Sequence, residues 1–499
     1  MRTRGNGLLF HITSLPAPYG IGDMGPEAHK FVDILAEAKQ KYWQILPLNF
    51  PIASNGYSPY FSDSAFAGNH LLLSPDLLIE EGLLLLEDIP PVPGADPGEV
   101  DYDGVTKHKK LILDKAFERF RKKDQKNDYD DFCRGQSGWL NDFALFAAIK
   151  EEQKGKIWHD WPASLRDRHP EALEEAGKRL AGKIDRQKFI QHMVFKQWSS
   201  LKSYANGRGI KIIGDIPIYV SYDSADVWVA PHIFKLDKRK RPMAVSGVPP
   251  DYFSATGQLW NNPVYRWDVL KDTRYDWWIE RLSHTFSCVD ILRIDHFRGL
   301  VQYWEVPAGE ETAMNGKWED VPTYDFFDTL LGHFKDFPVI VEDLGLITPD
   351  VKEAMDHYGF PGMRVLQFAF GEDKPDHPYL PQNYVKNCVA YTGTHDNNTL
   401  MGWLREEATP DVTHRVLDFL GERKISPGIN WKIITRLMGS VADTTVIPVQ
   451  DILALGSEAR MNQPRETFGN WKWRLLPGQF TKEHAGKLRG ITETTERSR

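Results

Sequence analysis

Short apolar runs, each followed by polar residues, recur along the chain and predict eight buried strands. They occupy residues 8–12, 42–46, 210–214, 289–294, 339–341, 364–368, 389–392 and 445–447. Runs this short and this rich in Val, Ile and Leu are typical of strands buried on both faces of a parallel sheet. Helical stripes fall between them, and the stripe from Thr348 to Gly359 has an N-cap residue, a proline in its first turn and a glycine stop. The pattern therefore predicts alternating strands and helices.

Eight strand and helix units favour a closed barrel over an open sheet. A doubly wound sheet that binds a dinucleotide would carry a Gly-x-Gly-x-x-Gly turn, and none is found. The predicted fold class is α/β, a (β/α)₈ TIM barrel with a large, mainly helical insertion after the second strand and a further loop-rich insertion after the third.

The positions of these insertions follow from where the alternation stops. Residues 72–205 show only helical stripes separated by Pro/Gly linkers, so we expect a helical insertion subdomain there. It would interrupt a barrel made of residues 1–71 and 206–499. Residues 248–260 lack any period and could move as a lid, because loops of this length in compact enzymes are usually functional or disordered.

Composition and charge exclude several classes of protein. Charged residues make up 26% and apolar residues 41%, as in soluble globular proteins. The net charge of -8, with only one short basic run at 235–241, argues against a nucleic-acid partner. The first apolar run is too short for a signal peptide or a membrane span, and three cysteines without metal-type spacing suit a reducing compartment. We expect a cytoplasmic protein that does not bind membranes.

Charged side chains gather where the predicted strands end. In a TIM barrel the carboxyl ends of the strands form the active-site face, so these side chains should meet there. Any one of the acids could instead cap a helix or form a surface ion pair, but four coincident strand ends favour a site. The residues concerned are Asp215, Arg293, Asp295, His296, Glu342, Asp343, His395 and Asp396.

Two of these acids have different surroundings in the sequence. Arg293 and Asp295 are two positions apart on a strand, so they point the same way and the cation should keep Asp295 ionised. Glu342 follows an apolar strand and has no adjacent cation, and nearby like charges favour its protonated form. Retaining glycoside chemistry needs such a pair. We assign Asp295 as the nucleophile and Glu342 as the general acid/base.

Two other chemistries use residues of the same types. Asp, Glu and His at a barrel mouth also bind Mg²⁺ or Zn²⁺, but Arg293 would repel a cation from Asp295, and neither His-x-His nor His-Glu-x-x-His occurs. A serine hydrolase would need a Gly-x-Ser-x-Gly elbow, which is absent. We expect neither a metal nor a cofactor.

Charged and glycine-containing motifs lie at 293–299, 342–345 and 394–397, and further motifs lie at 9–16, 58–69, 214–220 and 469–474. In their order and spacing they resemble those of the amylomaltases, the 4-α-glucanotransferases of glycoside hydrolase family 77, which are relatives of the α-amylases. Typical α-amylases have Asp-x-x-x-x-Asn-His after the third strand. This chain departs from that pattern at 215–220, which favours the glucanotransferase branch.

The resemblance implies a role for each matched residue. Asp295 would form a covalent glucosyl intermediate, Glu342 would protonate the departing oxygen and then deprotonate the acceptor, and Asp396 would brace the distorted sugar. The segment 248–260 is similar to the family's active-site loop. Other matched positions imply substrate binding: Arg293, His395, Asp215 and Tyr60 at that sugar, and Ser58, Gln258, Trp260 and Asn462 on the acceptor side. We expect Tyr60, Phe253 and Trp260 to stack on sugar faces, with loop packing as the alternative.

The expected activity is transfer of a glucan segment. The enzyme would cut α-1,4-glucosidic bonds in maltooligosaccharides, starch or glycogen-derived glucans and pass the fragment to the 4-hydroxyl of glucose or another glucan, by a retaining double displacement. Two alternatives stay open. One is an amylase-like retaining hydrolase, and the other is a glucan-binding protein with an inactive site.

Overall fold

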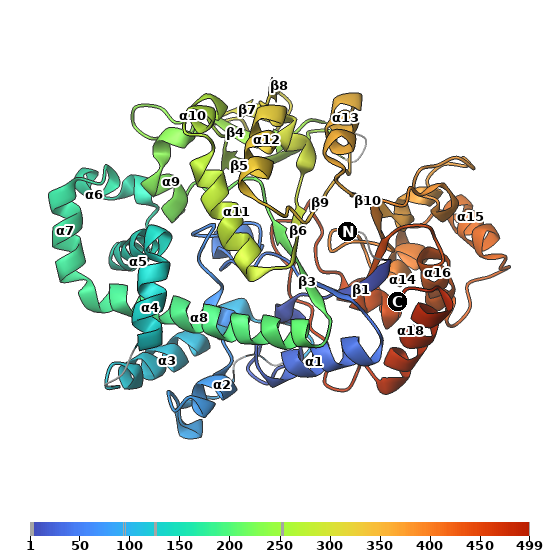
Figure 1. Cartoon of the computed structure of the whole chain (residues 1–499), viewed down its shortest axis with the longest axis horizontal. Coiled ribbons are helices and arrows are strands. Elements are labelled where there is room, and N and C mark those ends of the chain that lie inside the picture. The colour runs from blue at the N-terminus through green and yellow to red at the C-terminus, as the bar shows by residue number, and fades with distance from the viewer. Residues whose placement is uncertain (1–3, 93, 95, 124–126, 251–253, 499) are drawn as a thin grey trace.

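The computed structural model describes residues 4–92, 94, 96–123, 127–250 and 254–498 (Figure 1). Eight parallel strands form one sheet, in the order β10-β11-β12-β1-β2-β3-β6-β9. Each contains or overlaps one of the eight predicted apolar runs, so the predicted set of strands is confirmed. Their bounds are β1 Gly5–Leu9, β2 Tyr42–Gln44, β3 Lys211–Ile216, β6 Ile291–Ile294, β9 Val339–Val341, β10 Gly362–Val365, β11 Cys388–Tyr391 and β12 Thr444–Pro448.

Hydrogen bonds between its two end strands and across its interior show that the sheet curls into a barrel. The Val341 N–H, at the end of β9, donates to the Pro361 carbonyl at 3.0 Å, next to the start of β10. The Tyr391 hydroxyl on β11 donates to Gln44 Oε1 on β2 at 2.9 Å, although the two strands are not neighbours in the sheet. That bond must cross the interior. The predicted TIM barrel is therefore the observed fold.

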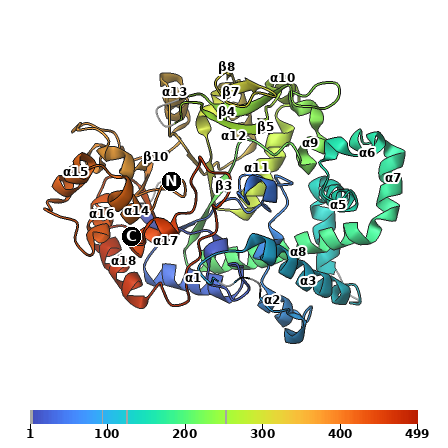
Figure 2. The same cartoon turned by 180° about the vertical axis from the view of Figure 1, so that it is seen from behind.

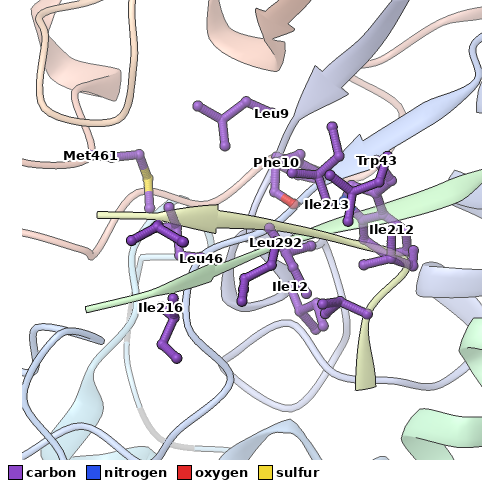
Figure 3. Packing of buried hydrophobic residues seen from close by; sticks show 14 of the residues in the cluster. Leu9, Phe10, Ile12, Trp43, Leu46, Ile212, Ile213, Ile216, Leu292 and Met461 are labelled. Atoms are coloured by element: carbon purple, nitrogen blue, oxygen red, sulfur yellow. Dashed lines mark hydrogen bonds between the residues drawn. The ribbon is translucent and has the colours of Figure 1, made fainter. Parts of the chain in front are cut away.

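Buried aliphatic and aromatic side chains fill the space between the strands and the layers around them. Figure 3 shows part of this core, with labelled residues from β1, β2, β3 and β6, from the segments after β1 and β2, and with Met461 from a later part of the chain. Trp43 on β2 is fully buried, and its indole N–H donates to the Phe10 carbonyl at 2.7 Å. The apolar runs of the sequence mark these strands because both of their faces are covered.

The helices surround the barrel and extend it on one side. Between β2 and β3 the chain forms seven described helices, which lie together beside the barrel (Figures 1 and 2). The last of them, α8, runs along α1. None of the described helices is long and apolar enough to cross a membrane. The bounds of the seven are α2 Pro75–Glu80, α3 Tyr102–Phe120, α4 Asn127–Gly135, α5 Ser137–Glu152, α6 Ala163–Arg166, α7 Pro170–Arg179 and α8 Ala181–Gly207.

The remaining helices cover the other sides of the barrel. Their bounds are α1 Pro26–Glu37, α9 Ala225–Val229, α10 Trp267–Asp272, α11 Asp276–Cys288, α12 Thr323–His333, α13 Pro349–Tyr358, α14 Leu400–Gly402, α15 Pro410–Leu420, α16 Ile429–Met438, α17 Val449–Ile452 and α18 Lys482–Thr494. Helix α13 has Thr348 as its N-cap position and Gly359, at φ 66°, as its C-cap, as predicted. The Thr348 hydroxyl, however, accepts a hydrogen bond from Arg298 at 2.6 Å.

A small antiparallel sheet, absent from the sequence prediction, lies over one side of the barrel. Its strands are β4 Ala244–Val248, β5 Gln258–Pro263, β7 Gln302–Pro307 and β8 Lys317–Asp320, in the order β5-β4-β7-β8. The segment 248–260 therefore begins in β4 and ends in β5, whereas the sequence predicted an irregular segment throughout. Gly, Asn and Pro residues in these strands conceal the alternation. Phe253 lies outside the described residues.

The amino ends of the strands are held together by the carboxyl-terminal segment. Arg497 is fully buried, and its guanidinium donates to the carbonyls of Met438 at 2.6 Å and Gly5 at 3.0 Å. Strand β1 pairs with β12 on one side, Gly5 opposite Thr444, and with β2 on the other. The first and last strands of the barrel thus become neighbours.

Candidate active site

Strands β6 and β9 carry the two acids singled out as a catalytic pair to the same rim of the barrel. The strands are adjacent, and Ile294 lies opposite Val341. Asp295 and Glu342 follow these two residues directly, so they emerge side by side. The Glu342 N–H donates to the Ile294 carbonyl at 3.0 Å, which extends the ladder to the rim.

The guanidinium of Arg293 lies among three carboxylates. Its Nη1 is 2.6 Å from Asp215 Oδ2 and 3.0 Å from Asp295 Oδ1, and its Nη2 is 3.6 Å from Glu342 Oε2. The expected pairing with Asp295 is present, and Asp215 on β3 lies opposite Arg293 in the sheet register. Although burial lowers the pKa of Arg293, the neighbouring carboxylates raise it well above its ordinary value. The cation therefore stays charged.

Glu342 does have a cation beside it, which corrects the prediction from its sequence neighbours. The cation is Arg293, which comes from the adjacent strand. Even so, burial first, and then the charge of Asp295, raise the pKa of Glu342 to about 8. Arg293 and the His296 N–H, which donates to Glu342 Oε2 at 2.6 Å, lower the pKa without offsetting the burial. At neutral pH Glu342 therefore holds a proton, as the sequence predicted.

Tyr60, in the loop after β2, ties two more of the predicted site residues together. Its hydroxyl donates to Asp215 Oδ2 and lies 2.8 Å from His395 Nε2, the same distance as to Asp215. Because the single hydroxyl proton is used on Asp215, His395 Nε2 must donate to Tyr60. Burial, and then the charge of Asp215, raise the pKa of Tyr60 well above its ordinary value, so the phenol stays neutral.

Asp396 follows β11 and is the most exposed of the predicted catalytic acids. Its side chain is 41% exposed, and its Oδ2 is 3.4 Å from His395 Nε2. The Asn462 amide donates to Asp396 Oδ1 at 2.7 Å, and Arg460 donates to the Asp396 carbonyl at 3.0 Å. The structure therefore brings Asn462, predicted on the acceptor side, to Asp396. Arg460 was missed because it lies in an irregular segment without a motif.

The other predicted binding residues lie on β5 and in the loop after β2. Trp260 and Gln258 are on β5, and the Trp260 ring meets the His296 ring at a centroid distance of 4.8 Å and an angle of 87°. Ser58 lies in the loop that carries Tyr60, and its hydroxyl accepts the Tyr60 N–H at 3.4 Å. Ser58 thus shapes the turn that presents Tyr60.

Asp343, expected at the same rim, has a different partner. Its carboxylate accepts the Met363 N–H at 2.6 Å and a bond from Arg364 at 2.9 Å, both on β10. It thus joins β9 to the next strand of the barrel, because its side chain points to the opposite side from that of Glu342.

The arrangement can support chemistry on a bond placed between two carboxyl groups. Glu342 can donate a proton. Asp295 contacts the same guanidinium, that of Arg293, and 26% of its side chain is exposed. In the described part of the chain, His, Cys, Asp and Glu form no group of three that could hold a metal ion. Tyr60, after β2, and His395 and Asp396, after β11, bring further polar side chains to this group.

Comparison with known proteins gives consistent matches over nearly the whole chain. The model of glycoside hydrolase family 77, described as 4-alpha-glucanotransferase, matches residues 10–479. The chain is similar to the 4-alpha-glucanotransferase of Synechocystis sp., at 47% identity over 98% of this chain and 97% of the relative. It is also similar to that of Thermus thermophilus, at 46% identity over 99% of both. Among solved structures, the amylomaltase from Streptococcus agalactiae in complex with acarbose matches with a TM-score of 0.96 and 40% identity over 99% of both chains.

Proposed function

Because the chain belongs to the 4-alpha-glucanotransferases of glycoside hydrolase family 77, it is an enzyme that moves α-1,4-glucan segments, and we propose that Asp295, Glu342 and Asp396 carry the reaction. The observation that supports these roles is that the carboxyl groups of Asp295 and Glu342 both lie next to the guanidinium of Arg293. Glu342 holds a proton at neutral pH, while Asp295 lies within 3.0 Å of Arg293. Retention needs one carboxyl group that donates a proton and a second that attacks the sugar.

In the first step Asp295 attacks the anomeric carbon of the donor glucan. The glycosidic C–O bond breaks as the bond to the Asp295 carboxylate forms, and the proton of Glu342 passes to the departing oxygen. The fragment with the new non-reducing end leaves. Arg293 stays charged throughout and stabilises the ionised Glu342 that remains.

In the second step Glu342 works as a base. It takes the proton from the 4-hydroxyl of the acceptor sugar, whose oxygen attacks the anomeric carbon and releases Asp295. The configuration at that carbon is retained because two displacements have occurred. Water in the acceptor position would give hydrolysis instead.

We assign the surrounding polar residues to the sugar that becomes attached to Asp295. Asp396, held by Asn462 and close to His395, braces the ring as positive charge develops on it. Tyr60 fixes Asp215 and His395 relative to each other, so the sugar meets an ordered group. Arg293 and His395 bind its hydroxyls, while Ser58, Gln258 and Trp260 serve the acceptor side.

We propose maltooligosaccharides and the α-1,4-glucans of starch or glycogen as donors, and glucose or another glucan as acceptor. The matching amylomaltase structure is a complex with acarbose, which supports a glucan ligand for this chain. No cofactor takes part, because the two carboxyl groups supply the nucleophile and the proton. We place the enzyme in the cytoplasm, where a reducing environment suits its three unpaired cysteines.

Incubation with maltotriose tests this function directly. Transfer should give free glucose and longer chains while the number of reducing ends stays constant, whereas an amylase-like hydrolase would raise that number steadily. Asp295→Asn should abolish both products, because the amide cannot form the covalent intermediate. A variant that keeps its full function would indicate a glucan-binding protein with an inactive site.

A further inference from the structure

His296, the residue directly after the proposed nucleophile, has a left-handed backbone. Its φ is 49° and its ψ is 54°, a conformation uncommon for residues other than glycine, although Asn, Asp and His adopt it more often than the rest. Such a conformation persists where the surrounding structure holds it, and at functional sites it can be part of the mechanism.

The left-handed turn directs two successive N–H groups at Glu342. The His296 N–H donates to Glu342 Oε2 at 2.6 Å, and the next N–H, of Phe297, donates to the Glu342 main-chain carbonyl at 3.2 Å. The side chain and the backbone of Glu342 are thus both held by the two residues that follow Asp295. The position of its carboxyl depends on the conformation of His296.

The imidazole of His296 has two close neighbours. It meets the Trp260 ring edge to face, at 4.8 Å and 87°. Gly299 also lies close to it, since an added Cβ there would come within 2.9 Å of the imidazole. Burial lowers the pKa of His296 to about 4, so the ring packs as a neutral group at working pH. A movement of the Trp260 ring must therefore displace the His296 imidazole.

We propose that His296 is a positioning residue that couples Trp260, on the acceptor side, to the carboxyl of Glu342. A sugar that rests on Trp260 fixes the imidazole, and the N–H of the same residue then holds Glu342 in line with the acceptor hydroxyl. Water makes no contact of this kind and gains nothing from it. The inference rests on the proposed roles of Glu342 and Trp260, and it explains how one carboxyl favours sugar acceptors over water.

The variant His296→Asn tests the coupling, because Asn tolerates the left-handed conformation and keeps the N–H but lacks the ring. Transfer is measured with maltotriose as the donor, as the incorporation of labelled glucose into longer chains. Hydrolysis is measured as the rise in the number of reducing ends. We expect transfer to fall about tenfold and hydrolysis by less than about threefold, the range of coupling found between contacting residues. In a Trp260→Phe background, His296→Asn should reduce transfer by a smaller factor than it does in the parent protein. If the two substitutions act independently, or both reactions fall equally, the proposal is wrong.

His284→Asn is a matched control. His284 on α11 is a partly buried histidine in a similar edge-to-face contact, 5.4 Å from the Trp139 ring, and it belongs to no part of the proposed site. The ratio of transfer to hydrolysis should stay at the parent value. If His296→Asn does not fold, His296→Gly keeps the N–H and the left-handed backbone and replaces it in the same assays.

The pH profile adds a readout that a purely structural role would not change. The hydrogen bond from the His296 N–H favours the ionised form of Glu342, so loosening this bond raises the pKa of Glu342. The alkaline limb of the kcat/KM profile should therefore move to higher pH in His296→Asn and stay in place in the His284→Asn control. An unmoved limb would overturn the proposal. If Glu342→Gln is inactive while His296→Asn keeps the parent ratio, only this inference fails; an active Glu342→Gln would overturn the proposed function as well. The other titratable groups whose charges act on Glu342 are Asp295, Arg293, Asp396 and Tyr379.

Discussion

Replacing Glu342 by Gln should make the protein more stable at alkaline pH while removing its activity. Burial and the charge of Asp295 raise the pKa of Glu342 from 4.5 to about 8. Between these two values the folded protein keeps a proton that the unfolded chain has lost. The free energy of unfolding therefore decreases as the pH rises through this window. A glutamine cannot ionise, so the variant avoids this loss.

The size of the effect follows from the shift in pKa. A shift from 4.5 to about 8 corresponds to about 5 kcal/mol at pH values above 8, since each pK unit is worth about 1.4 kcal/mol. The carbonyl oxygen of the glutamine can still accept the His296 N–H, so the hydrogen bond at 2.6 Å is kept. Near pH 5 the parent carboxyl is protonated in the folded state and the two proteins should be almost equally stable.

Thermal unfolding at a series of pH values between 5 and 9 measures the difference. The Tm of Glu342→Gln should match that of the parent at pH 5 and exceed it by several degrees at pH 9. Glu353→Gln, on the exposed surface of α13, is the matched control and should show no such trend. A difference in Tm that does not change with pH, or that favours the parent at pH 9, would refute the raised pKa.

Three further substitutions test other contacts. Tyr60→Phe removes the hydroxyl that donates to Asp215, so kcat for transfer should fall about tenfold with unchanged circular dichroism; parent-level kcat would refute its ordering role. Arg293→Lys keeps the charge but cannot contact three carboxylates at once, so kcat should fall at least about 100-fold, and a loss below threefold would contradict this. Lys109→Met removes the cation that lies 3.9 Å from the buried Asp23 carboxylate and should lower the free energy of urea unfolding by about 3–5 kcal/mol; an unchanged value would show that the pair contributes nothing.

Much of the barrel was predictable because its strands are buried on both faces. Their side chains form continuous apolar runs, which stand out from the polar residues that follow each strand. The antiparallel sheet was missed for the opposite reason: β5, for example, contains two asparagines and ends in a proline, and lies partly exposed. Its strands are defined by pairing with distant segments rather than by a local pattern.

The candidate site shows the same division. Asp295, Glu342 and Asp396 follow apolar strands, so their meeting at one rim could be inferred from the barrel alone. The cation near Glu342 could not, because Arg293 reaches it from the adjacent strand through the three-dimensional register. The left-handed backbone of His296 was equally hidden, since the preference of histidine for that conformation is too weak to predict it at one position.

The neighbouring positions of β1 and β12 matter for how the protein is made. Gly5 pairs with Thr444, and Arg497 binds the Gly5 carbonyl, so β1 can pair early with β2 on one edge but finds its partner on the other edge only after Thr444 has been synthesised. During synthesis the growing chain must keep one edge of β1 open while the rest of the ring is still absent. An unpaired strand edge can pair with a strand of another chain and cause aggregation. We therefore expect newly made protein to depend on chaperones until β1 and β12 have paired.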